Sequence, residues 1–237
     1  MTRPRKFSRR KPPAKRRHIL RTLLLLLFVP LAIFYAAIAG TLLLLRWINP
    51  PFTAVQVERR ISSWSEPEPY TKHYKFVPLN RISPNLQHAA IAAEDARFYQ
   101  HHGFDWNQIR LAAAEDLEEH RERGASTITQ QLVRNLFLST NRSIIRKALE
   151  FSMVPLTEGI LTKNRILELY LNVIEWGRGV FGAEAASRAY FGIPAQRLSR
   201  LQAAQLVSVL PSPLHRKPGQ VMGYTKRILV HMAESDW

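Results

Sequence analysis

The sequence lacks cysteine altogether and is poor in acidic residues, with 18 Asp and Glu against 34 Lys and Arg in 237 residues. The missing cysteines exclude disulfides, which agrees weakly with an extracytoplasmic domain that does without them. No acidic residue occurs before Glu58, and eleven of the bases lie there, so most of the net charge of +16 belongs to the N-terminal end. A basic excess of this size favours an anionic partner, either nucleic acid or a membrane surface.

Charge of either sign is missing from residues 22–45. As a helix rising 1.5 Å per residue, this run can cross a hydrocarbon core of roughly 30 Å, with a bend expected at Pro30. Ten bases precede it and Arg46 follows it, so the positive-inside rule predicts a cytoplasmic N-terminus. The competing interpretation is a cleaved signal peptide, because residues 37–39 form a small-x-small site. The apolar run continues to Leu45, which favours an anchor.

Four parts are therefore expected along the chain. Residues 1–21 form a basic cytoplasmic tail, 22–45 a transmembrane helix, 46–83 a linker and membrane-proximal region, and 84–237 the folded domain. The tail is short and lies next to the bilayer, so anionic lipid is its nearer partner. Nucleic-acid binding is not expected.

Beyond residue 83 the sequence shows no internal repeat and no β-rich block, and its apolar residues recur at helical spacing. Polar caps mark the helix starts, and the first of them is Ser83 before Pro84. The predicted helices begin at residues 84, 106, 127, 141, 162 and 199, and three of them end near residues 123, 177 and 210. Pro155 is expected to kink or break the fourth helix. The fold class is thus mostly α, with enough residues for one core.

The first candidate for chemistry is the stretch Glu94-Asp95-x-x-Phe98-x-x-His101-x-Gly103. If the helix continues past residue 94, Glu94, Phe98 and His101 share one face. An aromatic ring beside a carboxylate partly desolvates it, which suits a general base. The alternative is a surface glutamate followed by a helix-end histidine that caps carbonyl groups.

The second candidate is a group of charged residues, namely Arg142, Arg146, Lys147 and Glu150, to which Lys163 adds a cation. Clustered cations with one carboxylate can hold a phosphate or pyrophosphate while the carboxylate stays ionised. The alternative is an exposed helix salt bridge worth ~0.3–0.5 kcal/mol, which is the more common case.

The third candidate is the uncharged polar stretch GASTITQQLVRN, residues 124–135. Its members of interest are Gly124, Ser126, Thr127, Gln130, Gln131 and Asn135. The hydroxyls can cap a helix, but capping does not require the amides. Amides bind sugar hydroxyls and N-acetyl groups in a cleft without adding charge. A solvated helix face or an interhelical amide contact is the alternative.

Together these stretches resemble the peptidoglycan glycosyltransferase family, and most of all its monofunctional biosynthetic transglycosylases, which polymerise lipid II. Residues 94–103 match the motif Glu-Asp-x-x-Phe-x-x-His-x-Gly, and residues 124–131 match Gly-x-Ser-Thr-Ile-Thr-Gln-Gln. Residues 146–150 match Arg-Lys-x-x-Glu, and residues 163–172 match Lys-x-x-Ile-Leu-Glu-x-Tyr-Leu-Asn. A fifth motif resembles residues 177–191.

The resemblance implies a lysozyme-like glycosyltransferase domain behind one N-terminal transmembrane helix, in the bacterial inner membrane with its catalytic domain in the periplasm. It also implies a lipid-linked glycan strand as donor, lipid II as acceptor, and inverting β-1,4 transfer that releases undecaprenyl diphosphate. Glu94 matches the family's general base. Glu150 matches its second essential carboxylate, which either positions the leaving group or stabilises positive charge at the sugar.

The other motif residues are expected to bind substrate: Asp95, Phe98, His101, Gly124, Ser126, Thr127, Gln130, Gln131, Asn135, Arg146, Lys147 and Lys163. No obligatory cofactor or tight metal site is expected, and a loosely bound divalent cation at the pyrophosphate stays open. Partners among other cell-wall synthesis or division proteins stay open as well. The sequence has no Lys-Thr-Gly, so transpeptidase activity is not expected. The alternative functions are a lytic muramidase on the same fold and a catalytically silent cell-wall scaffold.

Overall fold

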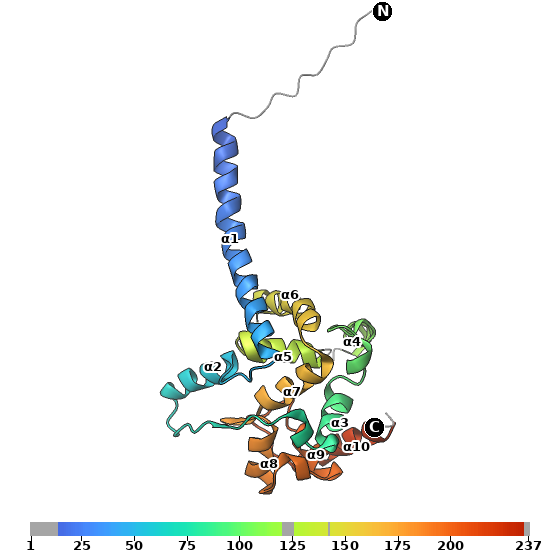
Figure 1. Ribbon diagram of the computed structural model, residues 1–237. Coiled ribbons are helices and arrows are strands. Elements are labelled where there is room, and N and C mark those ends of the chain that lie inside the picture. Colours follow the sequence, from blue (N-terminus) through green and yellow to red (C-terminus); the bar gives the residue numbers. More distant parts are fainter. Residues whose placement is uncertain (1–13, 120–125, 142, 235–237) are drawn as a thin grey trace, which may run out of the picture. The chain divides into compact units, whose positions relative to one another are not determined.

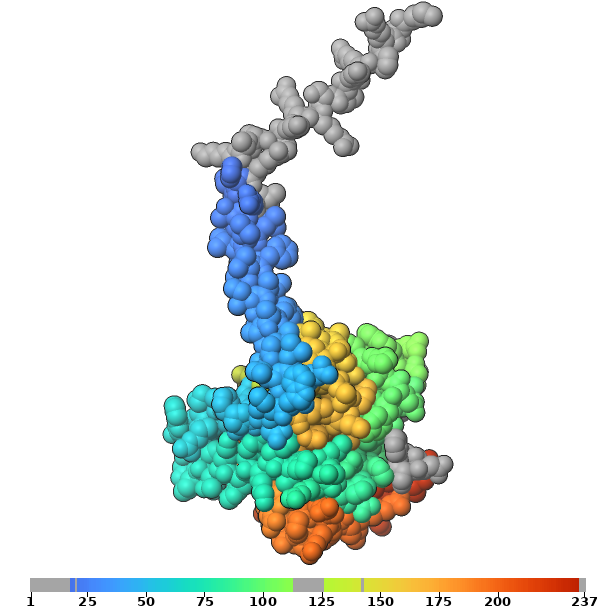
Figure 2. All heavy atoms as spheres, viewed as in Figure 1, coloured from blue at the N-terminus to red at the C-terminus, as the bar shows by residue number. Residues whose placement is uncertain are grey.

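The structure, a computed structural model, describes residues 14–119, 126–141 and 143–234 and divides the chain into two compact units. The first unit, Met1–Thr41, holds most of helix α1 (Ala14–Leu45) (Figure 1). Its segment Arg21–Leu45 has a mean hydropathy of 2.5, and by length and composition it can cross a membrane. Most large apolar side chains of this helix from Ile19 to Phe34 are exposed (Figure 2), unlike those of a core helix in a soluble protein.

The second unit, Leu42–Trp237, is mostly helical, which confirms the predicted fold class. Its helices are α2 (Ala54–Ser62), α3 (Pro84–Glu94), α4 (Trp106–Glu119), α5 (Ile128–Phe137), α6 (Ile144–Ile160), α7 (Lys163–Val173), α8 (Ala183–Phe191), α9 (Arg200–Val207) and α10 (Met222–Glu234). Short 3-10 helices lie at Ser63–Ser65, Leu79–Arg81, Phe98–Gln100 and Ala195–Arg197. A small sheet has the order β1 (His73–Tyr74), β3 (Val180–Phe181), β2 (Glu175–Gly177). Strand β3 is parallel to β1 and antiparallel to β2.

Side-chain caps begin several helices at the predicted positions. Thr127 and Gln130 form a reciprocal capping box on α5, and Ser199 and Gln202 form another on α9. Ser83 caps α3, whose first turn contains a proline. The predicted starts of these three helices are confirmed. They were predictable because each cap involves only residues that are neighbours in sequence.

The first candidate's shared face required a helix that continues past residue 94, and the structure does not have one. Helix α3 ends at Glu94, Asp95 adopts a φ of −164° as the C-cap, and Phe98 lies in a separate 3-10 helix. Glu94, Phe98 and His101 therefore do not share a helical face. The Asp95 carboxylate accepts a hydrogen bond from the backbone N–H of Ile128, and this long-range bond accompanies the turn of the chain away from the helix axis.

A predicted helix end and a predicted helix break also differ from the structure. Helix α7 ends at Val173 rather than near residue 177, because residues 175–177 form strand β2. Helix α6 runs unbroken through Pro155, so the break considered for this position is wrong. Met153 and Val154 are buried beside the proline, and their packing outweighs the lost backbone hydrogen bond.

The core of the second unit forms where α5 packs against α6 and α7, and where α3 packs against α9 and α10 (Figure 1). Ile128, Leu132 and Val133 of α5 are fully buried, as are Ile166 and Tyr170 of α7. Packing in this core therefore fixes the positions of the C-terminal end of α3 and the N-terminal half of α5. Both segments carry predicted functional residues.

Gly182 offers a direct test of how tightly this core is built. Its backbone has φ 83° and ψ 155°, a region that is essentially restricted to glycine. An added Cβ would lie 2.4 Å from the carbonyl oxygen of Asn172. We expect Gly182→Ala to lower the free energy of unfolding by more than about 3 kcal/mol.

The matched control is Gly192→Ala, because Gly192 also has a positive φ but open space around it. This change is expected to cost only about 1–2 kcal/mol. Thermal unfolding of both variants in detergent compares them directly. Equal losses would contradict the close approach at Gly182.

Candidate functional site

The site is built around Glu94, the last residue of α3. Its side chain lines a cavity of about 430 Å³ together with Ser126 and Gln131 and with side chains of α10. The Gln131 amide nitrogen, Nε2, donates a hydrogen bond of 2.8 Å to Glu94 Oε2. Burial raises the pKa of the Glu94 carboxyl above its ordinary value, while the Gln131 hydrogen bond and the charge of Arg134 act in the opposite direction.

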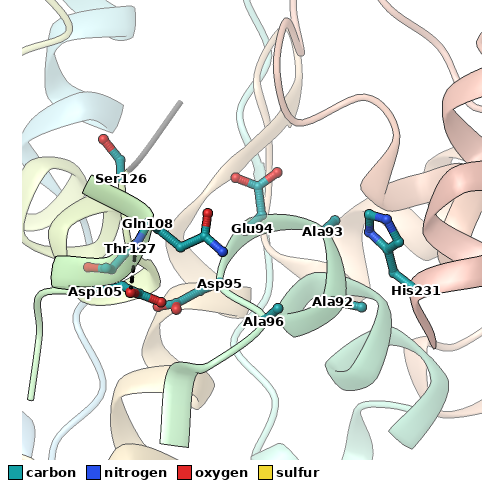
Figure 3. Close-up of a pocket in the computed structure, with 10 residues that line it drawn as sticks. All are labelled: Ala92, Ala93, Glu94, Asp95, Ala96, Asp105, Gln108, Ser126, Thr127 and His231. Carbon is teal, nitrogen blue, oxygen red and sulfur yellow. Dashed lines mark hydrogen bonds between the residues drawn. The ribbon is translucent and has the colours of Figure 1, made fainter. Parts of the chain in front are cut away.

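Asp95 follows Glu94 directly but points away from it, toward Asp105 and Thr127 (Figure 3). Its buried carboxylate accepts from the backbone N–H of Ile128 at 3.0 Å and lies 2.7 Å from Nε2 of His101. Because Ile128 is the first residue of α5, Asp95 ties the end of α3 to the positive end of the α5 dipole. In this arrangement Asp95 and His101 hold the backbone that carries Glu94.

The motif residues Phe98 and Lys163 lie together, and Lys163 has a different counter-charge from Arg146 and Lys147. Phe98 is fully buried, so it has no surface to offer a substrate in this conformation. The Lys163 ammonium lies 4.5 Å from the centre of the Phe98 ring and 2.8 Å from Glu158 Oε1. Glu158 also accepts a hydrogen bond of 2.5 Å from Thr129. Lys163 is thus a charge already balanced by Glu158.

The uncharged stretch divides into two sets of side chains. Gln130 is 1% exposed, and its side chain accepts from the backbone N–H of Thr127 to complete the cap of α5. Gln131 faces Glu94, whereas Asn135 lines a second cavity of about 370 Å³ beside Gln131. Gly124 lies outside the described residues. Two of the three amides therefore border cavities, and the third serves the helix.

Arg146 and Lys147 share a single counter-charge, the carboxylate of Glu150. The Glu150 side chain is 3% exposed, and its Oε2 accepts from Arg146 at 2.7 Å, while its Oε1 contacts the Lys147 ammonium. The Lys147 ammonium also lies 3.4 Å from Ser126 Oγ, and Ser126 lines the cavity of Glu94. This bond connects the cation cluster of α6 to the edge of the Glu94 cavity. Arg142, the remaining predicted member, lies outside the described residues.

Sequence reasoning missed three side chains that contact this site. Glu158 had no signal, because its partners Thr129 and Lys163 lie on other elements. Tyr170 stood inside a motif but without an assigned role. Arg134 was visible as the residue three positions after Gln131 and thus on nearly the same helical face.

Arg134 is a cation whose charge acts on Glu94. It lines the second cavity, and its charge lowers the pKa of Glu94. Among the residues that the structure describes, none forms a hydrogen bond with its guanidinium group. Its charge therefore remains available to a ligand in the second cavity.

Among the residues that the structure describes, one group of potential metal ligands lies beside the site. Oxygen and nitrogen atoms of Asp95, His101 and Asp105 lie within 4.8 Å of one another. All three are engaged, since Asp95 binds Ile128 and His101, and Asp105 accepts from Arg97 Nε at 2.9 Å. The positively charged guanidinium group of Arg97 already neutralises the carboxylate of Asp105. This group fits a structural network better than a metal site.

The described parts have the features of an enzyme site: a carboxylate that can accept a proton, amides suited to neutral polar ligands, and cations suited to an anionic group. Residues 59–233 match the family model described as Transglycosylase. The chain belongs to this transglycosylase family.

The matches to curated relatives span most of the length of each relative. A biosynthetic peptidoglycan transglycosylase of Pseudomonas aeruginosa is 43% identical over 219 residues, which is 92% of this chain and 94% of the relative. Proteins of the same name from Pseudomonas entomophila and Pseudomonas putida are 49% and 50% identical over 181 and 185 residues. These matches cover 76% and 77% of this chain, and 77% and 78% of the relatives.

Proposed function

We propose that this chain, a peptidoglycan glycosyltransferase of cell wall synthesis, polymerises lipid II with Glu94 as the general base. The observation that carries the proposal is the position of Glu94, half-buried at a cavity whose edge is linked through Ser126 to the cations of α6. A base and an anion-binding cluster are the two things that transfer from a sugar diphosphate requires.

In the proposed reaction Glu94 takes the proton from a sugar hydroxyl of lipid II, the acceptor. The hydroxyl oxygen then bonds to the anomeric carbon of the lipid-linked donor strand. The bond from that carbon to the diphosphate oxygen breaks, and undecaprenyl diphosphate leaves with the bonding pair. Attack opposite to the leaving group inverts the anomeric centre and gives a β-1,4 linkage.

The environment of Glu94 suits this step. A raised pKa makes the carboxylate a stronger base when it is ionised, and the nearby Arg134 charge keeps an ionised fraction available. Gln131 holds one carboxylate oxygen at 2.8 Å and so limits the directions in which the base can point. The second oxygen is left for the acceptor hydroxyl.

The leaving group needs cations more than it needs an acid, because a diphosphate departs as a stable anion. Arg146 and Lys147 can supply this charge, and Glu150 holds both of them in place. We assign Glu150 a positioning role through these cations. Lys163 is given no direct role, because Glu158 already balances it.

The substrate is lipid-linked, which gives α1 a role in the proposal. The apolar part of α1, residues 22–45, would anchor the chain as a single span of the bacterial inner membrane, with the ten bases before residue 22 in the cytoplasm and the second unit in the periplasm. An enzyme anchored in the membrane encounters a lipid-linked substrate by diffusion in the plane of the bilayer. No nucleic-acid or metal partner enters the scheme.

The test uses the purified full-length protein in detergent with labelled lipid II. Long glycan strands, released undecaprenyl diphosphate and no attack on finished peptidoglycan are expected. Soluble muropeptides cut from finished peptidoglycan would favour a lytic muramidase instead. If neither substrate changes, the chain is a silent scaffold and the proposal is wrong.

A further inference from the structure

Tyr170 reaches the carboxylate of Glu94 through one intervening side chain. The tyrosine lies on α7 and is fully buried. Its hydroxyl donates a hydrogen bond of 3.2 Å to Gln131 Oε1, and Gln131 Nε2 donates one of 2.8 Å to Glu94. Three side chains from α7, α5 and α3 thus form one chain of hydrogen bonds that ends on the proposed base.

The direction of this chain follows from what each group can donate. An ionised carboxylate only accepts, so the Gln131 amide must turn its N–H toward Glu94. Its oxygen then faces the tyrosine hydroxyl. If the amide turned over, two oxygens would face each other at Glu94, and the buried hydroxyl would lose the acceptor found for it among the described residues. Tyr170 therefore reinforces the amide orientation that the ionised carboxylate requires.

We infer that Tyr170 is a positioning residue for Glu94: its hydroxyl locks the Gln131 amide so that an N–H always faces the carboxylate. The inference rests on the proposed role of Glu94 as the base. The tyrosine touches neither the acceptor nor the donor, and its effect passes only through Gln131. Its contribution is to keep Glu94 oriented and ionised during each cycle.

Other groups that face Glu94 do not replace this lock. Arg134 of α5 favours the ionised carboxylate by its charge, and Asp95 disfavours it. From α10, His231 and Arg227 line the same cavity, as does Tyr224, whose pKa is raised chiefly by burial. Among the contacts of the described residues, Arg134, Asp95 and Tyr224 form no hydrogen bond with the Gln131 amide.

Tyr170 itself stays a donor across the working pH range. Burial, followed by the charge of Glu94, raises the pKa of its hydroxyl well above the ordinary value of a tyrosine. The hydroxyl therefore remains protonated wherever Glu94 is ionised and active. A donor that never titrates can hold the amide in one orientation throughout.

The experiment follows lipid II polymerisation by the full-length enzyme as a function of pH. Removing a donor that favours ionised Glu94 should raise the pKa of the base, so activity should fall at a higher pH as the solution is acidified. For Tyr170→Phe we expect the acid limb of kcat/KM to move up by about one pH unit, equivalent to about a tenfold loss on that limb. The rate should recover at alkaline pH with KM for lipid II unchanged.

The matched control is Tyr74→Phe. This variant also loses one partly buried hydroxyl, which in the parent donates to the Pro50 carbonyl oxygen at 2.7 Å, and Tyr74 lines none of the cavities beside Glu94 and Gln131. Its pH profile should superpose on that of the parent enzyme. In a Gln131→Leu background, Tyr170→Phe should shift the limb no further, because the two changes interrupt the same chain.

Each outcome decides a separate question. Superposed profiles for Tyr170→Phe and the parent, or an equal shift in the Gln131→Leu background, would overturn the positioning role while leaving the function intact. If the parent forms no polymer, the proposed function fails first. If Tyr170→Phe does not fold, 3,5-difluorotyrosine at this position keeps a stronger donor, and the acid limb should then move to lower pH. An unmoved limb would again contradict the inference.

Discussion

Glu94→Gln is expected to lower the rate of lipid II polymerisation by at least ~100-fold, the usual size of a lost general base. Glutamine keeps the shape of the side chain, but at neutral pH it cannot take the proton from the lipid II hydroxyl. The residual rate should no longer fall on acidification through the pKa of Glu94. The measurement is the initial rate of strand formation at saturating lipid II, which separates the chemical step from binding.

Glu184→Gln is a matched control, because Glu184 is a buried glutamate outside the cavities described above. Its carboxylate accepts from Arg188 at 2.6 Å and from the backbone N–H of Ala195 at 2.8 Å. Per folded molecule this variant should polymerise at the parental rate. A comparable loss in both variants would mean that Glu94 matters only for folding and would remove it as the base.

The same two variants should shift stability in opposite directions. Burial raises the pKa of Glu94, so its ionisation opposes folding, and stability falls as pH rises from the ordinary carboxyl range through the folded pKa. Glu94→Gln should therefore raise Tm at neutral pH, with the difference vanishing in acid. Burial also disfavours the charge of Glu184, but hydrogen bonds from Ala195 and Arg188 lower its pKa overall. Glu184→Gln should lower Tm at neutral pH, and this loss should shrink in acid.

The parts of this site that the sequence predicted are those set by neighbours in the chain. The capping box of Thr127 and Gln130 needs only three residues of spacing, and the pair of cations around Glu150 needs only one helical turn. Both were predictable because a helix fixes these distances without any help from the rest of the fold.

The parts that the sequence did not predict depend on contacts between distant elements. Helix α3 ends at Glu94, where Asp95 bonds to α5, and no local pattern contains that partner. Lys163 was grouped with the cations of α6 by type, whereas the fold pairs it with Glu158. Charge and spacing identify candidate residues, but only the packing of helices decides which charges remain available to a ligand.

Glu150→Gln is expected to reduce kcat by ~100-fold, the scale of a 1 Å misplacement in an active site, without moving the acid limb of the pH profile. The buried carboxylate is the shared counter-charge of Arg146 and Lys147, so an amide in its place releases both cations from their fixed positions. The variant should also lose about 2–3 kcal/mol in the free energy of unfolding, since two charge-assisted hydrogen bonds are weakened.

A double-mutant cycle separates positioning by Glu150 from direct contact with the sugar. In a chain that carries Arg146→Met and Lys147→Met, Glu150 has no cations left to position, so Glu150→Gln should change kcat by less than about twofold. If the full loss persists in that background, Glu150 acts on the substrate itself, as a carboxylate that stabilises positive charge at the sugar. Strongly non-additive rates, together with an unmoved acid limb of the pH profile, would instead show that Glu150 acts by holding Arg146 and Lys147 against the departing diphosphate.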